Sequence, residues 1–241
     1  MSLPKIFKPK FQADLVRLGG KTDGAYLIGT NSINQAENLI SYGIHDNWEF
    51  EKDFKNKNKN IKLQFYDDVL DFPFLIIKCL KQLAKFIFFQ KNYLLKSIFN
   101  LFSYFSFCRK FYIKKKINKK DMVNVKNIPN VFFKIDIEGS EYELLDNILL
   151  MQDNIVGLAI EFHDLNKNLD KVREFIENFS LDLIHIHPNN WANVNLNNIP
   201  EVLELSFEKN PKIISKNYTH PNELDIKNCS FKNEISLKFE D

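Results

Sequence analysis

The hydrophobic and polar positions of the chain follow two periods, one typical of buried strands and one typical of amphipathic helices. Six apolar runs have the length of strands, and most segments between them repeat apolar residues every three or four positions. Strands and helices that alternate in this way predict a doubly wound α/β domain with a mainly parallel sheet. The predicted strands cover 39–44, 61–66, 131–137, 155–163, 181–187 and 202–207.

Shorter elements complete this prediction. Two apolar runs within 15–28 flank Gly19-Gly20 and Asp23-Gly24, a pattern that predicts a β-hairpin. Helices are expected over 31–38, from the acidic loop 45–54 onward and over 169–179. Apolar residues that alternate within 235–239 predict a last edge strand.

The most informative stretch is 131–145. An apolar run leads to Asp136 and Glu138, and Ser140 with Glu143 predicts a capping box at the start of a helix. The two acids would then lie at the carboxyl edge of the sheet, where open α/β sheets bind ligands. The alternative is a surface turn with solvated acids, but the apolar run before Asp136 favours a buried strand.

Three other predicted strands also end in polar groups, namely Gly43 with Asp46, Asp67 with Asp68, and Glu161 with His163. Together these groups indicate a small-molecule pocket. The chain has neither G-x-G-x-x-G nor G-x-x-x-x-G-K-[ST], so phosphate cradling is not expected. Gly43 allows close backbone approach, and Asp67 can hold a ribose diol. Ribose recognition without phosphate recognition points to S-adenosylmethionine (SAM) rather than NAD.

Composition sets the outer limits. A chain of 241 residues favours one α/β domain with room for a small accessory element. The three cysteines share no metal-like spacing, which fits a reducing compartment. The first residues lack a signal-peptide core, and no uncharged apolar run approaches the roughly 18–20 residues of a membrane span. We therefore expect a cytoplasmic protein, with peripheral contact at the inner face of the membrane as one option.

Charge is distributed unevenly. The segment 72–120 holds 12 of the 33 basic residues and no acidic residue, which leaves 21 basic against 31 acidic residues elsewhere. Its spacing predicts two or three helices, and we treat it as a helical insert between 1–71 and 121–241. It could pack as a lid or dimer interface, dock on an anionic membrane, or bind nucleic acid through stacking aromatics. The nucleic-acid interpretation is disfavoured because most of the Phe residues would be needed for a core.

The chain resembles the FkbM-type SAM-dependent methyltransferases, a Rossmann-like class I family. The matching pieces occur in the expected order over about three quarters of the chain: Leu15-Val-Arg-Leu-Gly with Asp23-Gly-Ala-Tyr, Ser41-Tyr-Gly-Ile-His-Asp-Asn-Trp-Glu-Phe-Glu51, Tyr66-Asp67, Phe133-Lys-Ile-Asp-Ile-Glu-Gly-Ser-Glu141, Glu161-Phe-His163, His187-Pro-Asn-Asn190 and Ile199-Pro-Glu-Val-Leu-Glu-Leu205. The run 134–141 is the most specific of these. The chain departs from the family at 72–120, where a compact helix–strand unit would be expected.

The resemblance implies methyl transfer to an oxygen, commonly on sugars or other small hydroxylated molecules, with surface-polysaccharide biosynthesis as the setting. It implies that Tyr42, Gly43 and Ile44 contact the cofactor and that Asp67 binds its ribose. We add Asp68 and Asp136 to the predicted cofactor site because they end the neighbouring strands.

Methyl transfer from an activated donor requires an oriented acceptor and a base that takes its proton. His163 is the first candidate base because it follows a strand end, and His185 and His187 are second candidates. Each could instead be a packed, hydrogen-bonded histidine. On the acceptor side we expect five residues, although the first two could be purely structural: Arg17, Asp23, His187, Asn189 and Asn190.

A divalent metal is a further possibility at the same strand ends. Asp136, Glu161 and His163 would supply two carboxylates and one imidazole, a set that suits Mg²⁺ or Mn²⁺ better than Zn²⁺. Such a cation would bind the acceptor hydroxyls and lower their pKa. The alternative is that Asp136 serves SAM and that Glu161 pairs with Arg17 or a backbone amide.

The sequence therefore predicts a SAM-dependent O-methyltransferase that acts on a sugar or nucleotide-sugar. A homodimer is compatible with this prediction, and nucleic acid is not an expected partner. The competing hypothesis is a non-catalytic membrane- or RNA-binding module on a methyltransferase-like scaffold.

Overall fold

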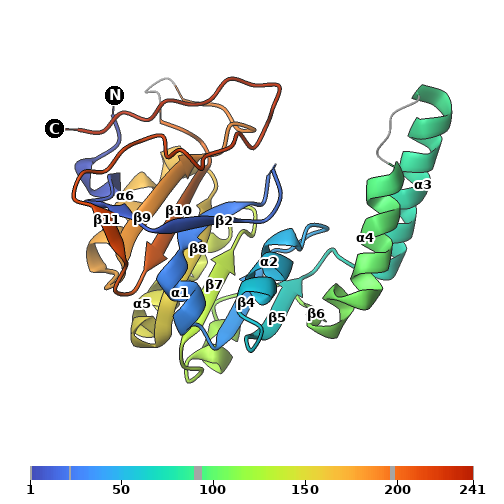
Figure 1. Cartoon of the computed structure of the whole chain (residues 1–241), viewed down its shortest axis with the longest axis horizontal. Helices are drawn as coiled ribbons and strands as arrows, with labels where there is room; N and C mark the ends of the chain where they lie inside the picture. Colours follow the sequence, from blue (N-terminus) through green and yellow to red (C-terminus); the bar gives the residue numbers. More distant parts are fainter. Residues whose placement is uncertain (1, 22, 90–93, 196–198, 241) are drawn as a thin grey trace.

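The computed structural model describes residues 2–21, 23–89, 94–195 and 199–240. Within them a seven-stranded sheet has the order β6-β5-β4-β7-β8-β10-β9 (Figure 1). Its strands are β4 (Asn38–Tyr42), β5 (Lys62–Asp67), β6 (Tyr112–Lys114), β7 (Val131–Ile135), β8 (Ile155–Phe162), β9 (Asp182–Pro188) and β10 (Leu203–Glu208). The strands from β6 to β8 are parallel, and β10 runs antiparallel to both β8 and β9. This order, with its one reversed strand, is the class I Rossmann-like methyltransferase fold, as predicted.

Helices cover both faces of the sheet, which explains why its central strands are mostly apolar. Every residue of β7 and β8 is buried. Phe132 packs in the cluster that contains α1 (Thr30–Gln35) and α2 (Glu49–Lys57). The next residue, Phe133, packs in the cluster that contains α5 (Leu145–Leu150) and α6 (Leu165–Asn178). Successive side chains of one strand thus supply the two halves of the core.

Two small ribbons accompany the main sheet. The predicted hairpin is present as β2 (Leu15–Leu18) paired antiparallel with β3 (Tyr26–Gly29). The other ribbon pairs β1 (Gln12–Ala13) with β11 (Ile213–Ser215), and the sequence analysis missed it. The predicted strand at 235–239 is wrong. Only a single bridge joins Phe239 to Leu3, and Leu237 is buried because the tail packs on the core.

The predicted insert forms a long helical hairpin and then returns to the sheet. Helices α3 (Phe72–Phe89) and α4 (Leu94–Ser106) stand away from the body (Figure 1). A single 3₁₀ turn, η2 (Cys108–Lys110), leads into β6, which pairs with β5 and completes the sheet edge. The helical part therefore ends at 110 rather than at the predicted boundary of 120. Across the residues described, no helix is both long and apolar enough to cross a membrane.

The remaining 3₁₀ turns are η1 (Lys5–Phe7), η3 (Asp121–Val125), η4 (Glu141–Glu143) and η5 (Gln152–Asn154). The predicted capping box is wrong, because the Ser140 side chain makes no cap hydrogen bond at η4. Glu138 and Gly139 have positive φ angles of 53° and 102°, and they turn the chain sharply. As a result the buried Glu141 accepts the backbone N–H groups of Ile137 and Gly139, at 3.2 and 3.1 Å.

Candidate functional site

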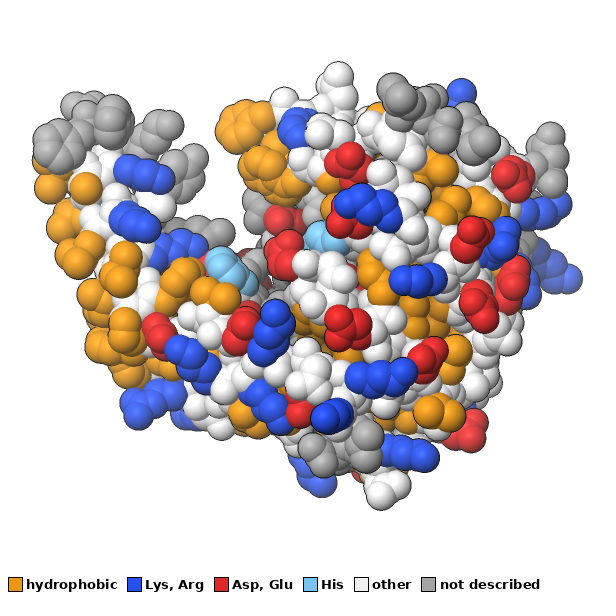
Figure 2. Space-filling view, turned by 180° about the vertical axis from the view of Figure 1, so that it is seen from behind, with side chains coloured by type: hydrophobic (Ala, Val, Ile, Leu, Met, Phe, Trp, Pro, Cys, Tyr) orange, Lys and Arg blue, Asp and Glu red, His pale blue; other side chains and the backbone are white. Residues whose placement is uncertain are grey.

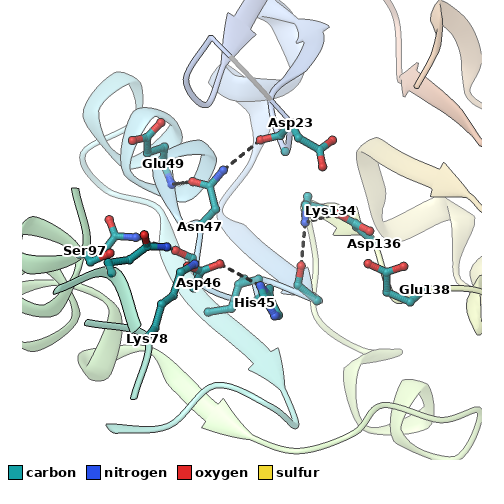
Figure 3. A pocket seen from close by; sticks show the side chains of 15 residues that line it. Asp23, His45, Asp46, Asn47, Glu49, Lys78, Ser97, Lys134, Asp136 and Glu138 are labelled. Carbon is teal, nitrogen blue, oxygen red and sulfur yellow. Dashed lines mark hydrogen bonds and ion pairs between the residues drawn. The ribbon is translucent and has the colours of Figure 1, made fainter. Parts of the chain in front are cut away.

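Two cavities open at the carboxyl edge of the parallel strands and share four lining residues, Gly43, His45, Asp136 and Glu138. The first cavity, of about 400 Å³, lies between the ends of β4 and β7, the β2–β3 turn and the α3–α4 hairpin. Figure 3 shows Lys78 and Asp46 on one side of it and Asp136 and Glu138 on the other. The second cavity, of about 290 Å³, lies beside the end of β5 and the segment 115–117. The shared residues stand where the strand order reverses, between β4 and β7.

Gly43 forms the backbone junction between the two cavities. Its φ of 76° is in the left-handed region that glycine adopts readily, and a side chain there would overlap the backbone of Asp136. Its N–H donates to the carbonyl of Tyr66 at 2.9 Å. Ile44, which was predicted to contact the cofactor, lines the first cavity. Tyr42, the third residue predicted to contact the cofactor, is buried against Tyr66 and lines neither cavity.

Asp67 and Asp68 both line the second cavity. The carboxylate of Asp67 accepts three backbone N–H groups, from His45 at 2.8 Å, Val69 at 2.7 Å and Leu70 at 2.8 Å. Asp67 therefore holds the loop that follows Gly43 in addition to lining the cavity. Asp68 is exposed beside it.

Lys134 is a buried cation that lines the first cavity, and it was not among the predicted site residues. Its Nζ donates to the carbonyl of Gly43 at 2.9 Å and lies 3.3 Å from Asp136 Oδ2. Burial alone would lower its pKa, but the charges of Asp136 and of the buried Glu51 raise it. Tyr26 also donates its hydroxyl to Asp136 at 3.2 Å. The one signal in the sequence is a lysine inside the apolar run 131–135.

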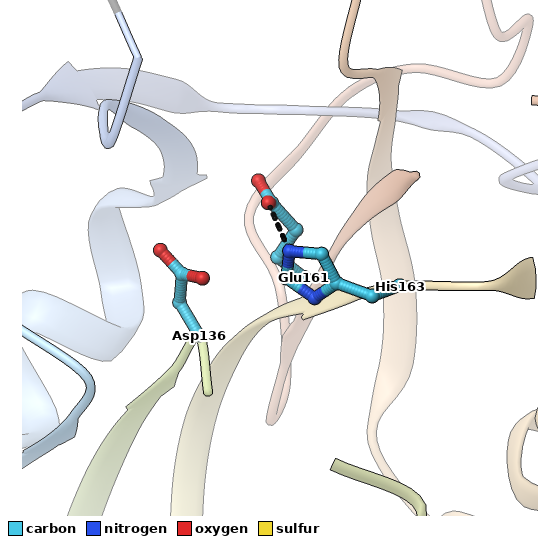
Figure 4. A group of neighbouring side chains, drawn as sticks. All are labelled: Asp136, Glu161 and His163. Atoms are coloured by element: carbon cyan, nitrogen blue, oxygen red, sulfur yellow. Dashed lines mark ion pairs between the residues drawn. The ribbon is translucent and has the colours of Figure 1, made fainter. Parts of the chain in front are cut away.

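The structure brings Asp136, Glu161 and His163 together, as predicted (Figure 4). One potential ligand atom from each lies within 4.8 Å of the others. His163 Nε2 is 3.1 Å from Glu161 Oε1, and His163 Nδ1 is 2.8 Å from Glu141 Oε1. Of these three residues, only Asp136 lines the two cavities. His163 borders them, because its Nε2 is 3.4 Å from the carboxylate of Glu138, which lines both.

Protonation within this cluster bears on the predicted base. Burial alone would lower the pKa of His163, but hydrogen bonds to Glu141 and Glu161 raise it to about 11. The ring therefore favours the charged form, and a charged ring cannot accept a proton. Burial and the neighbouring charge of Asp136 raise the pKa of Glu161. In the protein without ligands, the arrangement disfavours His163 as a base and suits it better to stabilising negative charge.

Two amides connect this cluster to further acids. Asn189 donates to Asp23 at 3.0 Å and to Glu161 at 3.2 Å. Asp23 and Asn189, two of the five residues predicted on the acceptor side, therefore lie beside the cluster. Asn228 donates to Asp23 at 3.2 Å and to Glu204 at 2.7 Å. Glu204 and Asn228 were not predicted. Asp23, Glu161 and Glu204 form a second group of carboxylates with oxygens within 4.8 Å of one another.

The other predicted residues, Arg17, His185, His187 and Asn190, line neither of the two cavities. Arg17 donates to the carbonyl of Gly20 at 3.3 Å, and its charge interacts with that of Glu204. His187 is buried between Glu204 and Glu234, at 3.5 and 3.1 Å. Asn190 is not at the site, because its side chain holds the tail through the backbone of Cys229. The buried His185 pairs with Asp225 at 2.9 Å and lines neither cavity.

No protein-family model and no curated protein matches the chain. Among solved structures it is similar to precorrin-6y C5,15-methyltransferase from Geobacter metallireducens, with 9% identity, TM-score 0.39, and coverage of 74% of this chain and 85% of that one. It is also similar to M. capricolum TrmK in complex with S-adenosyl-homocysteine, with 14% identity, TM-score 0.38, and coverage of 80% of this chain and 70% of that one. A third similar structure is an rRNA methylase from Streptococcus thermophilus, with 13% identity, TM-score 0.38, and coverage of 74% of this chain and 92% of that one. The fold assignment rests on the strand order of the sheet.

Proposed function

We propose that the protein is a SAM-dependent O-methyltransferase of the FkbM type that acts on a hydroxyl group of a sugar or nucleotide-sugar. The observation that carries this proposal is the junction of two cavities at Gly43 and Asp136, on either side of the point where the strand order reverses. Doubly wound sheets bind their ligands at this point. Methylation of sugars in surface-polysaccharide biosynthesis is a setting that rests on the resemblance alone.

In this proposal SAM lies across the junction. The adenosine part occupies the second cavity, where Asp67 or Asp68 receives the ribose hydroxyls. The methionine part passes Gly43 into the first cavity, whose acidic lining tolerates a sulfonium cation. Asp46 and Lys78, which face each other there as an ion pair, would meet the amino acid end of the cofactor.

The acceptor is expected on the side of Asp23, Asp136 and Glu161. Carboxylates and side-chain amides are good partners for hydroxyl groups, and Asn189 already joins two of these acids. The acceptor oxygen would form its bond to the methyl carbon as the bond from carbon to sulfur breaks, and the sulfonium would become the neutral thioether of S-adenosylhomocysteine. The hydroxyl proton passes to a carboxylate of the cluster, that of Asp136 or Glu161.

The same cluster fits a divalent cation such as Mg²⁺ or Mn²⁺. His163 Nδ1 faces the buried Glu141 at 2.8 Å, an arrangement that orients the other ring nitrogen as a metal ligand. Asp136 and Glu161 would supply the oxygens. A bound cation would lower the pKa of the acceptor hydroxyl.

Titration calorimetry with SAM tests the cofactor assignment. We expect binding that Asp67→Ala weakens, and we then expect transfer of the radiolabelled methyl group from SAM to one member of a nucleotide-sugar panel. His163→Ala should lower turnover by about 100-fold while SAM affinity is retained, because the charged ring no longer stabilises negative charge on the acceptor oxygen. The absence of SAM binding would reject the proposal and favour the non-catalytic module.

Metal dependence has a separate readout. Calorimetry with Mn²⁺ and the metal-free protein should show one site, which Glu161→Gln weakens by about tenfold or more. Glu204→Gln is the matched control, because Glu204 belongs only to the second carboxylate group. Full methyl transfer in EDTA, or equal Mn²⁺ affinity in the Glu161 variant, would exclude this cation site without affecting the SAM assignment.

A further inference from the structure

The α3–α4 hairpin has two unlike sides. Its inner side is polar where it meets the body, and Lys78, Gln82 and Asn100 line the first cavity. Its outer side carries an apolar strip of six exposed residues, Ile77 (50%), Leu80 (58%), Ile87 (64%), Leu95 (64%), Phe99 (68%) and Phe102 (70%). Figure 2 shows hydrophobic side chains gathered along the edge of the hairpin that faces away from the body. The predicted lid would have turned an apolar face inward, whereas here the apolar face is turned outward.

The spacing of the apolar strip follows helix geometry. Leu95, Phe99 and Phe102 are four and three residues apart, so they share one face of α4. Leu80 and Ile87 are seven residues apart on α3, with Ile77 beside them. Two helices that each expose a continuous apolar stripe are typical of segments that lie in a membrane interface.

The base of the hairpin is fixed to the body, so the apolar strip has a defined direction. The indole N–H of Trp48 donates to Ser103 Oγ at 2.8 Å, and Lys52 Nζ lies 3.0 Å from the same oxygen. Asn100 donates to the carbonyl of Asp46 at 3.0 Å. These contacts hold α4 against the loop that follows β4, beside the first cavity.

Charge identifies the partner. Lys81 and Lys85 are exposed on α3, Arg109 and Lys110 are exposed at the foot of the hairpin, and 72–120 has no acidic residue. The remainder of the chain has ten more acidic than basic residues. An anionic surface would attract the hairpin and repel the body, which orients the molecule with the apolar strip toward that surface. Two stacked hairpins would bring like charges together, and aliphatic side chains such as Leu80 suit lipid better than nucleic acid.

We propose that the α3–α4 hairpin docks on an anionic lipid bilayer and inserts the apolar strip into its interface. Docking through the apolar strip holds the first cavity one hairpin's width from the lipid surface, because the inner side of the same hairpin lines that cavity. If the proposed function holds, the acceptor hydroxyl belongs to a molecule carried by the membrane, such as a lipid-linked sugar. The docking itself does not depend on the methyl transfer.

Sedimentation with vesicles tests the docking. The protein should bind vesicles of phosphatidylcholine and phosphatidylglycerol, and its binding to phosphatidylcholine alone should be at least about tenfold weaker. The double substitution Phe99→Asp and Phe102→Asp should weaken binding to the anionic vesicles by about tenfold or more. Phe231→Asp is the matched control, since Phe231 is 90% exposed and lies outside the hairpin.

A second pair of variants separates charge from apolar contact. Lys81→Glu with Lys85→Glu should weaken vesicle binding by about tenfold or more, since each basic residue near an anionic lipid surface contributes to the binding energy. Lys10→Glu with Lys216→Glu, exposed lysines outside the hairpin, should leave it unchanged. All four variants should keep the wild-type circular dichroism and SAM affinity, so a failure of SAM binding alone would reject only the proposed function.

Four results would overturn the docking proposal. The wild-type protein could ignore anionic vesicles, or bind neutral and anionic vesicles equally. It could form a dimer in ultracentrifugation that the Phe99 and Phe102 variant abolishes, which would assign the apolar strip to a second copy. It could bind RNA through the hairpin lysines while vesicles do not compete.

Discussion

A Cβ atom built on Gly43 would lie 1.6 Å from the carbonyl oxygen of Asp136. The two residues follow neighbouring parallel strands, and Asp136 N donates to the carbonyl of Tyr42 at 3.0 Å. The turns after β4 and β7 therefore pack backbone against backbone, at the junction of the two cavities. Any side chain at 43 would separate these turns.

The first prediction concerns this contact. We expect Gly43→Ala to lower the free energy of unfolding by about 3 kcal/mol or more, through the clash and the positive φ, and to abolish SAM binding. Gly139→Ala is the matched control, because Gly139 also has a positive φ but no atom lies within 4 Å of its built Cβ. It should cost about 1–2 kcal/mol. Equal losses in the two variants, measured by urea unfolding, would show that the contact with Asp136 is unimportant.

The second prediction separates the two acids of the second cavity. Asp67→Asn replaces an acceptor of three backbone N–H groups with an amide that can itself donate. We expect the free energy of unfolding to fall by about 1–3 kcal/mol and SAM affinity, measured by calorimetry, to fall with it. Asp68→Asn, at an exposed carboxylate, should leave stability unchanged within about 0.5 kcal/mol. If Asp68→Asn alone weakens SAM binding, Asp68 is the ribose ligand and Asp67 only holds the loop.

Much of the fold was predictable from periodicity, because the central strands are buried on both faces. The run 155–163 is apolar enough to predict β8 without any tertiary information. The short edge strand β6 was not predictable, since its three residues lie among lysines and pair only with β5. The alternation at 235–239 was misleading because an irregular tail that packs on a core can bury alternate residues without pairing.

The candidate site was predictable where it follows strand ends, and not where it depends on long-range partners. Gly43, Asp136 and Glu161 each end a strand, and parallel topology brings such ends to one edge. The charged state of His163 follows from Glu141, which reaches it only because the turn at 138–139 folds back. Asn228 lies in the irregular C-terminal region, where no periodicity predicts its position.

The third prediction is a pH dependence of stability from Glu208, a buried residue remote from the two cavities. Burial raises its pKa from 4.5 to about 7, although it accepts the N–H of Ser32. Between about pH 4.5 and 7 the folded state thus binds more protons than the unfolded state, so this residue lowers the free energy of unfolding as pH rises, by about 3 kcal/mol in total. Glu208→Gln cannot titrate. In urea unfolding from pH 4.5 to 8, the free energy of unfolding of the variant should rise relative to that of the wild type as the pH increases. If the two free energies change in parallel with pH, the assignment to Glu208 is wrong.

The fourth prediction concerns the buried cation Lys134, which is 4% exposed and faces two acids. Lys134→Met should lower the free energy of unfolding by about 3–5 kcal/mol, because it leaves Asp136 and Glu51 without their buried counter-charge. The exposed strand residue Lys62 gives the control, since Lys62→Met should change stability by less than about 0.5 kcal/mol. Adding Glu51→Gln to Lys134→Met removes one uncompensated acid, so we expect the double variant to be about 1–3 kcal/mol more stable than the sum of the two single effects. Strictly additive effects in urea unfolding would mean that Lys134 and Glu51 do not interact.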